Sequence, residues 1–296
     1  RAKIETGKPV LLTEHGIYTN ERRIEVASAD WLEETASKSL TIDRLRNNLR
    51  DFWINSFTSF SYICYEGADQ IVTLFEGNQK MQRQDGANPG KMRLIPNGVD
   101  IERFQAIQAE RHDRPTIALI GRVVPIKDIK SYIRSVAMVQ EIIPELRAYV
   151  MGPTDEDIDY YQECRQMVEY MGLQEVITFT GQVSIDKYLP QIDVAVLTSI
   201  SEAMPLSVLE TGACGIPSVT TDVGACREII EGRLQDRDTV GDGGIVVPLS
   251  NPTAMAQGIM KLLKEQDFYR SCSEVIRKRV ETLYNKQDQM SAYKEL

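Results

Sequence analysis

The sequence predicts an α/β protein in which a parallel sheet is covered by helices on both faces. From Pro115 onward, short apolar runs alternate with longer segments of helical periodicity, which is the pattern of parallel strands joined by crossover helices. The stretch from Asp193 to Asp222 shows this pattern most clearly, as strand, loop, helix, turn and strand. Its strand runs are rich in Val, Leu and Ile, as is typical of strands buried on both faces.

Before residue 99 the elements are sparser. Apolar runs predict strands at 9–13, 70–74 and 92–95, a helix over 30–66 and a short helix over 78–85. Residues 99–114 are mixed and charged, and we place a domain boundary after residue 108.

The regular part of the chain follows. Strands are predicted at 117–120, 146–151, 176–179, 193–198, 216–220 and 244–247, and helices at 129–140, after 157, at 185–189, 205–213, 224–230, 251–264 and 266–285. Pro205 fits the first position of its helix, where the missing N–H costs nothing, and Gly215 ends that helix.

Composition limits the functional classes. The chain has 296 residues, enough for about two domains, and a net charge of −9, which argues against a nucleic-acid-binding protein. The five cysteines are odd in number and lack C-x-x-C spacing, so we expect reduced thiols in a cytoplasmic protein. No apolar run approaches the ~18 residues that a membrane span needs.

Two acids mark the central stretch, Glu202 in the loop and Glu210 on the helix, with seven residues between them. A loop between a parallel strand and a helix start is where α/β folds bind ligands, and the exposed amides of residues 204–207 would suit an anion. The alternative is an ordinary βαβ unit with two surface glutamates, because acids near helix starts are favoured by the macrodipole.

Arg122 and Lys127 sit in one strand-to-helix connection and are expected to project toward the loop at 199–206. Paired cations beside helix-start amides would form a diphosphate site, and the alternative is two solvated basic residues. His15 follows a strand and precedes a glycine, where it could bind a ligand hydroxyl or serve structure alone. Residues 155–157 resemble a D-x-D metal site, but acids at a helix start are more often caps, so no metal is assigned.

Several motifs together resemble one family. These are I-P-N-G-V-D (95–100), G-R-V-V-P-I-K-D (121–128), S-E-A-M-P-L-S-V-L-E (201–210) and G-G-I-V-V-P-L (243–249), and they are similar to the C-terminal half of retaining GT-B glycosyltransferases of family 4. T-E-H-G-I-Y-T-N-E-R (13–22) adds a resemblance to the PelF-like branch of that family, the glycosyltransferases of Pel exopolysaccharide synthesis.

The resemblance implies the GT-B fold, with two Rossmann-like lobes and a cleft between them. Residues 1–108 would be the acceptor-side lobe, 109–265 the nucleotide-sugar-binding domain, and 266–296 a C-terminal helix that packs back towards the first lobe. A full first lobe of this family begins well before the position of His15, so we expect that lobe to be incomplete here.

The resemblance also implies the activity, a hexosyltransferase that passes a sugar from a UDP-sugar such as UDP-glucose to a growing exopolysaccharide, with retention and without a metal or other cofactor. Arg122 and Lys127 would hold the diphosphate, Glu202 the donor sugar and Glu210 the ribose. The other implied contacts are His15 with the sugar, Gly181 and Val183 with the base, and the amides of Ala203, Met204, Pro205 and Leu206 near the sugar.

The implied partners are the nucleotide-sugar donor, the polysaccharide acceptor and a membrane complex for exopolysaccharide synthesis and export, which would place the protein at the inner face of the membrane. Two alternatives share the fold. A nucleotide-sugar epimerase would release free UDP without an acceptor, and a non-catalytic subunit would bind UDP-sugar without turnover. The complete set of Glu202, Glu210, Arg122 and Lys127 argues against the second.

Overall fold

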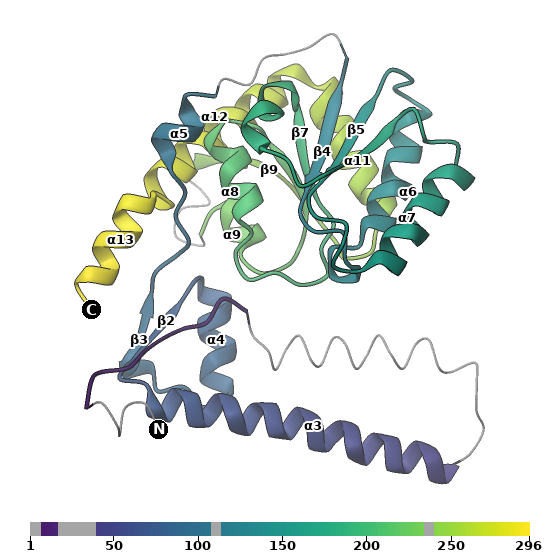
Figure 1. Ribbon diagram of the computed structural model, residues 1–296. Coiled ribbons are helices and arrows are strands. Elements are labelled where there is room, and N and C mark those ends of the chain that lie inside the picture. The colour runs from purple at the N-terminus through teal and green to yellow at the C-terminus, as the bar shows by residue number, and fades with distance from the viewer. Residues whose placement is uncertain (1–6, 17–39, 108–113, 234–239) are drawn as a thin grey trace. The chain divides into compact units, whose positions relative to one another are not determined.

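A computed structural model describes residues 7–16, 40–107, 114–233 and 240–296 of the chain (Figure 1). The chain divides into two compact units, Arg1–Pro96 with Leu296, and Asn97–Glu295. The boundary that we expected after residue 108 falls outside the described residues, and the contacts of the described residues divide the chain at Pro96 instead.

The first unit holds a parallel sheet of three strands in the order β1-β2-β3. Its elements are β1 (Leu11–Thr13), α3 (Leu40–Gly67), β2 (Gln70–Thr73), α4 (Glu76–Gln84), η1 (Pro89–Lys91) and β3 (Met92–Leu94). All three strands confirm the sequence prediction, with Leu11 opposite Gln70 and Ile71 opposite Met92. The expected helix from residue 30 is described only from Leu40, since residues 30–39 lie outside the described residues.

The second unit is built on a six-stranded parallel sheet in the order β6-β5-β4-β7-β8-β9. The strands are β4 (Thr116–Ile120), β5 (Arg147–Met151), β6 (Ile177–Gly181), β7 (Val194–Leu197), β8 (Ser218–Thr221) and β9 (Gly244–Val247). The chain starts at β4, runs to one edge, and then returns to the other side of β4 with β7. The strand order therefore reverses between β4 and β7, and α/β sheets bind ligands at such a reversal.

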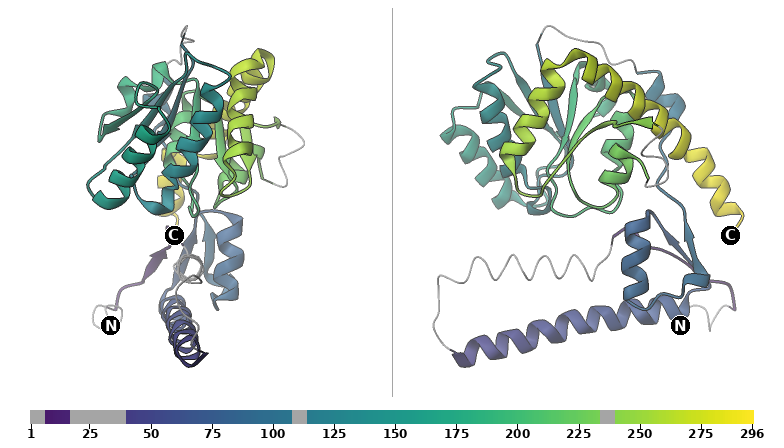
Figure 2. Two further views of the ribbon diagram at one scale, coloured as in Figure 1. Left: turned by 90° about the vertical axis from the view of Figure 1, so that its right-hand side faces the viewer. Right: turned by 180° about the vertical axis from the view of Figure 1, so that it is seen from behind.

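Helices cover both faces of this sheet, as the alternating pattern predicted (Figures 1 and 2). The helices are α5 (Ile101–Gln105), η2 (Pro125–Lys127), α6 (Ile129–Gln140), α7 (Ile158–Tyr170), η3 (Ile185–Lys187), η4 (Leu189–Gln191), α8 (Leu206–Ala213), α9 (Cys226–Glu231), α11 (Pro252–Lys264), α12 (Gln266–Leu283) and α13 (Lys286–Lys294). On one face α6 packs against α7 and α11, and on the other α8 packs against α9 and α12.

The main core lies under α6, α7 and α11. It joins strand residues such as Ile117 and Val194 to helix residues such as Ile133 and Ile259, each 0% exposed. Burial of an aliphatic side chain of this size stabilises a fold by ~1.5–3 kcal/mol, so this layer holds the sheet rigid beneath the loops at its carboxyl edge.

Glycine sets how closely those loops approach. Gly152 follows β5 with φ 155°, and a Cβ built there would lie 2.1 Å from the carbonyl oxygen of Gly121, which follows β4. Only a residue without a side chain permits that approach. The connections that leave β4 and β5 are therefore held side by side.

Among the described residues, the sequence prediction missed two α-helices. Helix α5 lies in the segment that we described as mixed, where Asp100 caps it by accepting a hydrogen bond from the Arg103 amide at 3.0 Å and Phe104 is buried. Helix α13 follows the expected end of the last helix, after α12 stops at Leu283. Helix α12 packs on α8, α9, α11 and β9 of its own unit, and packing towards the first lobe stays a prediction.

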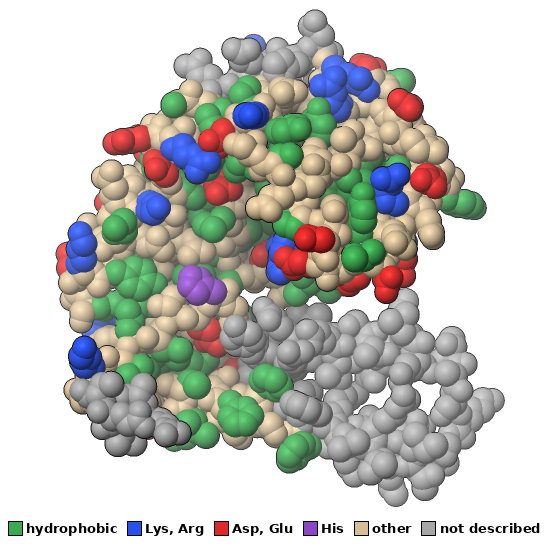
Figure 3. All heavy atoms as spheres, in the orientation of Figure 1, with side chains coloured by type: hydrophobic (Ala, Val, Ile, Leu, Met, Phe, Trp, Pro, Cys, Tyr) green, Lys and Arg blue, Asp and Glu red, His purple; other side chains and the backbone are tan. Residues whose placement is uncertain are grey.

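The cysteines and the surface charges can be compared with what the composition led us to expect, which was reduced thiols and no nucleic-acid-binding surface. All five cysteines fall among the described residues and are free, and four of them are buried. On the face shown in Figure 3, the described Lys and Arg side chains of the second unit are interspersed with Asp and Glu and form no continuous basic area. Within the described ranges, no helix has both the length and the apolar character needed to cross a membrane.

Candidate functional site

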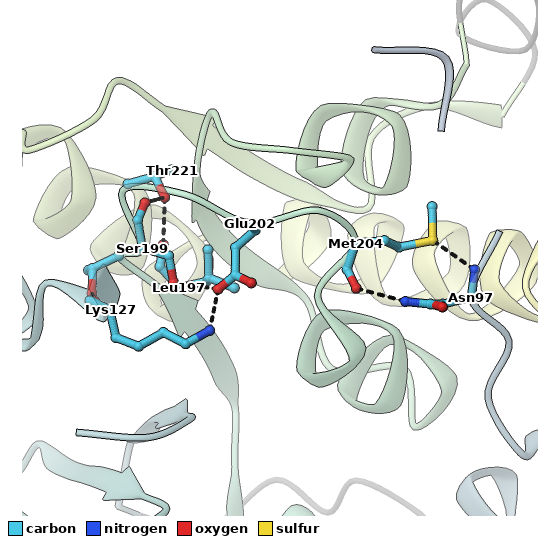
Figure 4. A network of polar contacts seen from close by, with 8 residues as sticks. Asn97, Lys127, Leu197, Ser199, Glu202, Met204 and Thr221 are labelled. Carbon is cyan, nitrogen blue, oxygen red and sulfur yellow. Dashed lines mark hydrogen bonds and ion pairs between the residues drawn. The ribbon is translucent and has the colours of Figure 1, made fainter. Parts of the chain in front are cut away.

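An ion pair joins the two loops at the reversal of strand order. Lys127 ends η2, which follows β4, and Glu202 lies in the loop that follows β7. The Nζ atom of Lys127 pairs with Oε1 of Glu202 (Figure 4). The two side chains are 19% and 14% exposed, so the pair is shielded from water yet open on one side. Shielding strengthens the attraction between the charges and makes them available to a ligand as a fixed dipole.

Among the described residues, the groups that hold Glu202 act on one carboxylate oxygen, Oε1. The hydroxyl of Ser199 donates a second hydrogen bond to Oε1 at 2.6 Å, and Thr221 donates to the carbonyl oxygen of Ser199, also at 2.6 Å. No hydrogen bond from the described residues reaches Oε2 of Glu202. One carboxylate oxygen is therefore fixed by protein groups, while the other is left to accept hydrogen bonds from a ligand.

Hydrogen bonds to two main-chain carbonyl groups fasten the two loops to each other. The hydroxyl of Thr198 donates to the carbonyl oxygen of Lys127 at 2.8 Å, and the amide of Ile200 donates to the carbonyl of Ile126 at 2.9 Å. Lys127 and Glu202 are thus held together by the main chain as well as by their charges. A site fixed in this way needs little reorganisation when a ligand binds.

The helix that carries Glu210 begins one residue later than predicted. Pro205 has φ −71° and ψ 116°, which is extended, so it occupies the N-cap and Leu206 is the first helical residue. The prediction that Pro205 starts the helix was wrong because the chain enters α8 directly from an extended loop. No side chain of the described residues caps α8, and its first amides carry the partial positive charge of a helix start.

The loop before α8 is braced from two directions. Asn97 donates from its side-chain amide to the carbonyl of Met204 at 3.2 Å, and from its backbone amide to Sδ of Met204 at 3.1 Å (Figure 4). From the other direction, the amide of Ala225 donates to the carbonyl of Ala203 at 2.7 Å. Met204 is 5% exposed, and its side chain anchors the loop in the second unit.

Arg122 does not join this cluster. Its guanidinium pairs with Glu156 at 2.8 Å, and the side chains are 53% and 44% exposed. We expected both cations to reach the loop at 199–206. Lys127 does so, whereas Arg122 turns toward the start of α7. Exposed ion pairs are worth little, so Arg122 can leave Glu156 for a stronger anion at small cost.

The acidic run before α7 behaves as a helix start. Asp157 caps α7 by accepting a hydrogen bond from the amide of Tyr160 at 3.0 Å, as its place in the sequence indicated. Among the described residues, no group of three or more His, Cys, Asp and Glu side chains is arranged to hold a metal ion.

Glu210 lies on α8 in a partly buried position of its own. Burial raises the pKa of its carboxyl group, Arg103 of α5 opposes that rise, and Asp186 of η3 adds to it. Arg103 and Asp186 form an ion pair with a shortest distance of 2.7 Å. Glu210 is therefore a carboxylate with one positive and one negative neighbour, in a partly desolvated environment.

The remaining predicted residues lie at other strand ends. Gly181 ends β6 in a left-handed conformation with φ 66°, and its carbonyl accepts a hydrogen bond from the amide of Gly152 at 3.0 Å. Val183 follows in the next turn and is half-buried. His15 follows β1 in the first unit and is exposed, next to the buried Glu14.

The structure thus joins Lys127 to Glu202. Residues 203–205 continue the loop that holds Glu202, and Glu210 lies on α8, the helix that follows this loop. The structure turns Arg122 to another partner and leaves His15 in the other unit. Four further residues were missed: Ser199, Thr221, Asn97 and Arg103. Thr221, Asn97 and Arg103 act through partners far away along the chain, so local pattern could not find them. Ser199 lies just after a strand end and only three positions from Glu202, so its position was the local signal that could have found it.

Comparison with known families gives two matches. Residues 100–279 match the glycosyl transferases group 1 family, and residues 1–90 match a domain of unknown function, DUF3492. Among curated proteins, the chain is 28% identical over 199 residues to D-inositol 3-phosphate glycosyltransferase of Kribbella flavida, covering 62% of this chain and 43% of that protein.

It is also 25% identical over 242 residues to an N-acetylgalactosaminyltransferase of Campylobacter jejuni that acts on N,N'-diacetylbacillosaminyl-diphospho-undecaprenol, covering 77% of this chain and 59% of that protein. The chain therefore spans about half the length of the curated relatives that it matches.

Solved structures show the fold. HepE of Anabaena in complex with UDP superposes with a TM-score of 0.74 at 16% identity, over 100% of this chain and 74% of that one. Sucrose-phosphate synthase of Thermosynechococcus elongatus gives a TM-score of 0.74 at 21% identity, over 96% and 66%. The expected GT-B fold class, with parallel α/β sheets, is confirmed.

Proposed function

The chain belongs to the glycosyl transferases group 1 family, and from this premise we propose that it transfers a sugar from a nucleotide diphosphate sugar with retention at the anomeric carbon. The observation that carries the proposal is the shielded pair of Lys127 and Glu202 at the reversal of strand order. A cation and an acid fixed there match the two halves of such a donor, an anionic diphosphate and a hydroxyl-rich sugar.

Each part of the donor has a partner. Lys127 and the amides at the start of α8 bind the diphosphate, and Arg122 joins them on leaving its exposed pair with Glu156. The free oxygen of Glu202 accepts a sugar hydroxyl beside the 203–206 loop, and Glu210 accepts the ribose hydroxyls. In the remaining assignments, Gly181 and Val183 border the base and His15 binds the sugar.

The chemistry follows from the charges. When the sugar leaves, negative charge develops on the departing diphosphate, and a fixed ammonium beside it lowers that barrier. The sugar becomes oxocarbenium-like, and the leaving phosphate accepts the acceptor's proton on the same face, which gives retention. In this scheme the cations neutralise the charge that a metal neutralises in other transferases. We therefore expect turnover to persist in EDTA.

The donor is a UDP-sugar in this proposal. Its support is the likeness to HepE, whose structures contain UDP and UDP-glucose. As acceptor we propose a growing exopolysaccharide, by resemblance to the PelF-like branch, made in association with a membrane complex at the cytoplasmic face. This acceptor would distinguish the protein from an epimerase, which needs none.

Titration calorimetry with UDP tests the donor site. Lys127→Ala and Glu210→Ala are expected to weaken UDP binding by roughly 10- to 100-fold each, since hydrogen bonds to charged groups are worth ~1.5–3 kcal/mol. Lys130→Ala is the matched control, because Lys130 lies nearby on α6 but pairs with Glu163. Unchanged affinity in both site variants would overturn the assignment.

Turnover separates the remaining readings. With UDP-sugar and polysaccharide acceptor, transfer should yield UDP and an extended polymer. An epimerised sugar in acceptor-free reactions would replace the proposal with epimerisation, and binding without turnover would replace it with a carrier role.

A further inference from the structure

A second ion pair lies beside Glu210, and the donor roles assigned above leave it without a function. Arg103 on α5 binds Asp186 on η3 with two of its nitrogens, Nε to Oδ2 at 3.2 Å and Nη2 to Oδ1 at 2.7 Å. Nη2 also lies 2.9 Å from Oδ2. The pairing is bidentate, a geometry that fixes the orientation of both side chains as well as their charges.

The pair joins segments that the chain keeps far apart. Arg103 and Asp186 are separated by 83 positions, and they tie α5 to the turn that follows β6. Helix α5 also packs on α8, where its buried Phe104 offers a carbonyl oxygen to Sγ of Cys214 at 3.3 Å. Arg103 is therefore placed by a helix that packs on α8, and its charge acts on Glu210 of that helix.

We propose that Arg103 is a positioning residue of the ribose subsite, which holds η3 against α5 through Asp186 and keeps a positive charge beside Glu210. The inference rests on the proposed function, because it deepens the role given to Glu210. Arg103 touches no donor atom in this scheme; it acts through Glu210 and through the turn that borders the base.

The physical reason is the state of the Glu210 carboxyl. An ionised carboxylate offers both oxygens as acceptors to the two hydroxyls of a ribose, whereas protonation turns one of those oxygens into a donor. Burial raises the pKa of Glu210 and so favours the neutral acid, and Asp186 pushes in the same direction. Arg103 is the neighbour that opposes them.

Two other cations on the helices that pack on α8 are engaged elsewhere. On α12, Arg277 donates to the carbonyl oxygen of Cys214 at 2.6 Å, and on α9, Arg227 pairs with Asp222 and Glu231. The strands under α8, β7 and β8, carry no charged residue. Arg103 is thus the cation whose removal would change the ionisation of Glu210 most.

The test compares ribose with deoxyribose. UDP, ADP and GDP are first titrated into the wild-type chain, and the tightest binder is then used with its 2′-deoxy form from about pH 5.5 to about pH 8.5. In Arg103→Met the ribonucleotide should bind roughly 10-fold more weakly near neutral pH, with a larger loss at lower pH. The preference for ribose over deoxyribose should shrink in parallel, because the loss acts through Glu210.

Two more variants test whether the charge next to Glu210 controls the pH dependence of nucleotide affinity. Arg103→Lys keeps the charge and should keep the wild-type pH profile, although it loses the bidentate geometry. Asp186→Asn removes a negative neighbour of Glu210, so its low-pH loss of affinity should begin at lower pH than in wild type. Arg165→Met is the matched control, since Arg165 is 54% exposed and pairs with Glu169 on α7.

Two outcomes are distinguishable failures. If the wild-type chain binds none of the three nucleotides, the proposed function falls and this inference falls with it. If the wild type binds but Arg103→Met keeps both the wild-type pH profile and the wild-type ribose preference, the positioning role of Arg103 alone is overturned.

Discussion

Lys127 and Glu202 are 75 positions apart in the chain, and the ammonium of the first lies on the carboxylate of the second. Ser199 donates to the same carboxylate oxygen, so that atom is shared by two donors. The cation assigned to the diphosphate is therefore partly neutralised before any ligand arrives. A ligand that binds Lys127 must compete with Glu202 for it, and this competition can be measured.

Replacing Glu202 by Gln should separate binding from turnover. The amide keeps the shape of the side chain but removes its charge, so Lys127 is released to the diphosphate and UDP should bind a few-fold more tightly. Transfer from UDP-sugar should fall by roughly 100-fold, because the sugar loses an acceptor in the transition state. Calorimetry with UDP and a turnover assay check both effects. Weaker UDP binding in this variant would contradict the competition.

Asn97→Ala should loosen the loop before α8. The variant loses the hydrogen bond to the carbonyl of Met204, worth ~1 kcal/mol, and the affinity for UDP-sugar should fall several-fold. The control is Asn251→Ala, which removes the cap of α11 at Ala254 and should cost a similar ~1 kcal/mol of stability without any change in affinity. Equal affinities in the two variants would argue that Asn97 serves folding alone.

Gly224→Ala should damage the same loop by collision. Gly224 has φ 53°, and a Cβ there would lie 2.3 Å from the carbonyl oxygen of Ala203 and 2.4 Å from that of Glu202. Gly172 is the matched control, because it has φ 69° but nothing within 4 Å of its Cβ. Thermal unfolding should show a loss of ~1 kcal/mol for Gly172→Ala from backbone strain and about 3 kcal/mol for Gly224→Ala. A similar loss in both variants would mean that the loop moves away freely.

Glu210→Gln should stabilise the ligand-free protein in a pH-dependent way. Burial raises the pKa of Glu210 above the ordinary value of 4.5, so the folded state binds the proton more tightly than the unfolded state does. The associated stability is fully present below pH 4.5 and is lost as pH rises through the raised value. Near neutral pH the ionised carboxylate destabilises the folded state, and glutamine removes this charge.

The melting temperature of Glu210→Gln should therefore exceed that of the wild type at neutral pH, and the difference should diminish toward pH 4.5. Nucleotide affinity should fall in the same variant, as is common where a site is built at the expense of stability. A melting temperature that is lower at every pH would show that the ionised form is favoured by groups other than Arg103.

Much of the second unit could be read from local pattern. The apolar runs of β4, β7 and β8 predict buried strands, and their alternation with amphipathic helices predicts the parallel sheet. Because ligands bind at the carboxyl ends of such strands, the loops that hold Lys127 and Glu202 were also predictable. Helix α5 was not, since it spans only Ile101–Gln105 and shows too few turns for a periodic signal.

The partners of the site residues were beyond local pattern. Arg122 and Lys127 lie in one connection, yet one pairs with Glu156 and the other with Glu202. Their partners come from different strand ends, since Glu156 follows β5 and Glu202 follows β7. Pro205 likewise took the N-cap because the loop before it is drawn to Asn97 through Met204, 107 positions away.

The sequence by itself determined the α/β class, the strand ends and the residue types at the candidate site, because burial periodicity and helix-start chemistry act within a few residues of the chain. Only the tertiary structure decided which charges meet. Lys127 reaches Glu202, Arg103 reaches Asp186 beside Glu210, and Asn97 reaches Met204 because sheet order and helix packing bring distant segments together. Such contacts depend on the position of whole elements, and no short stretch of sequence encodes that position.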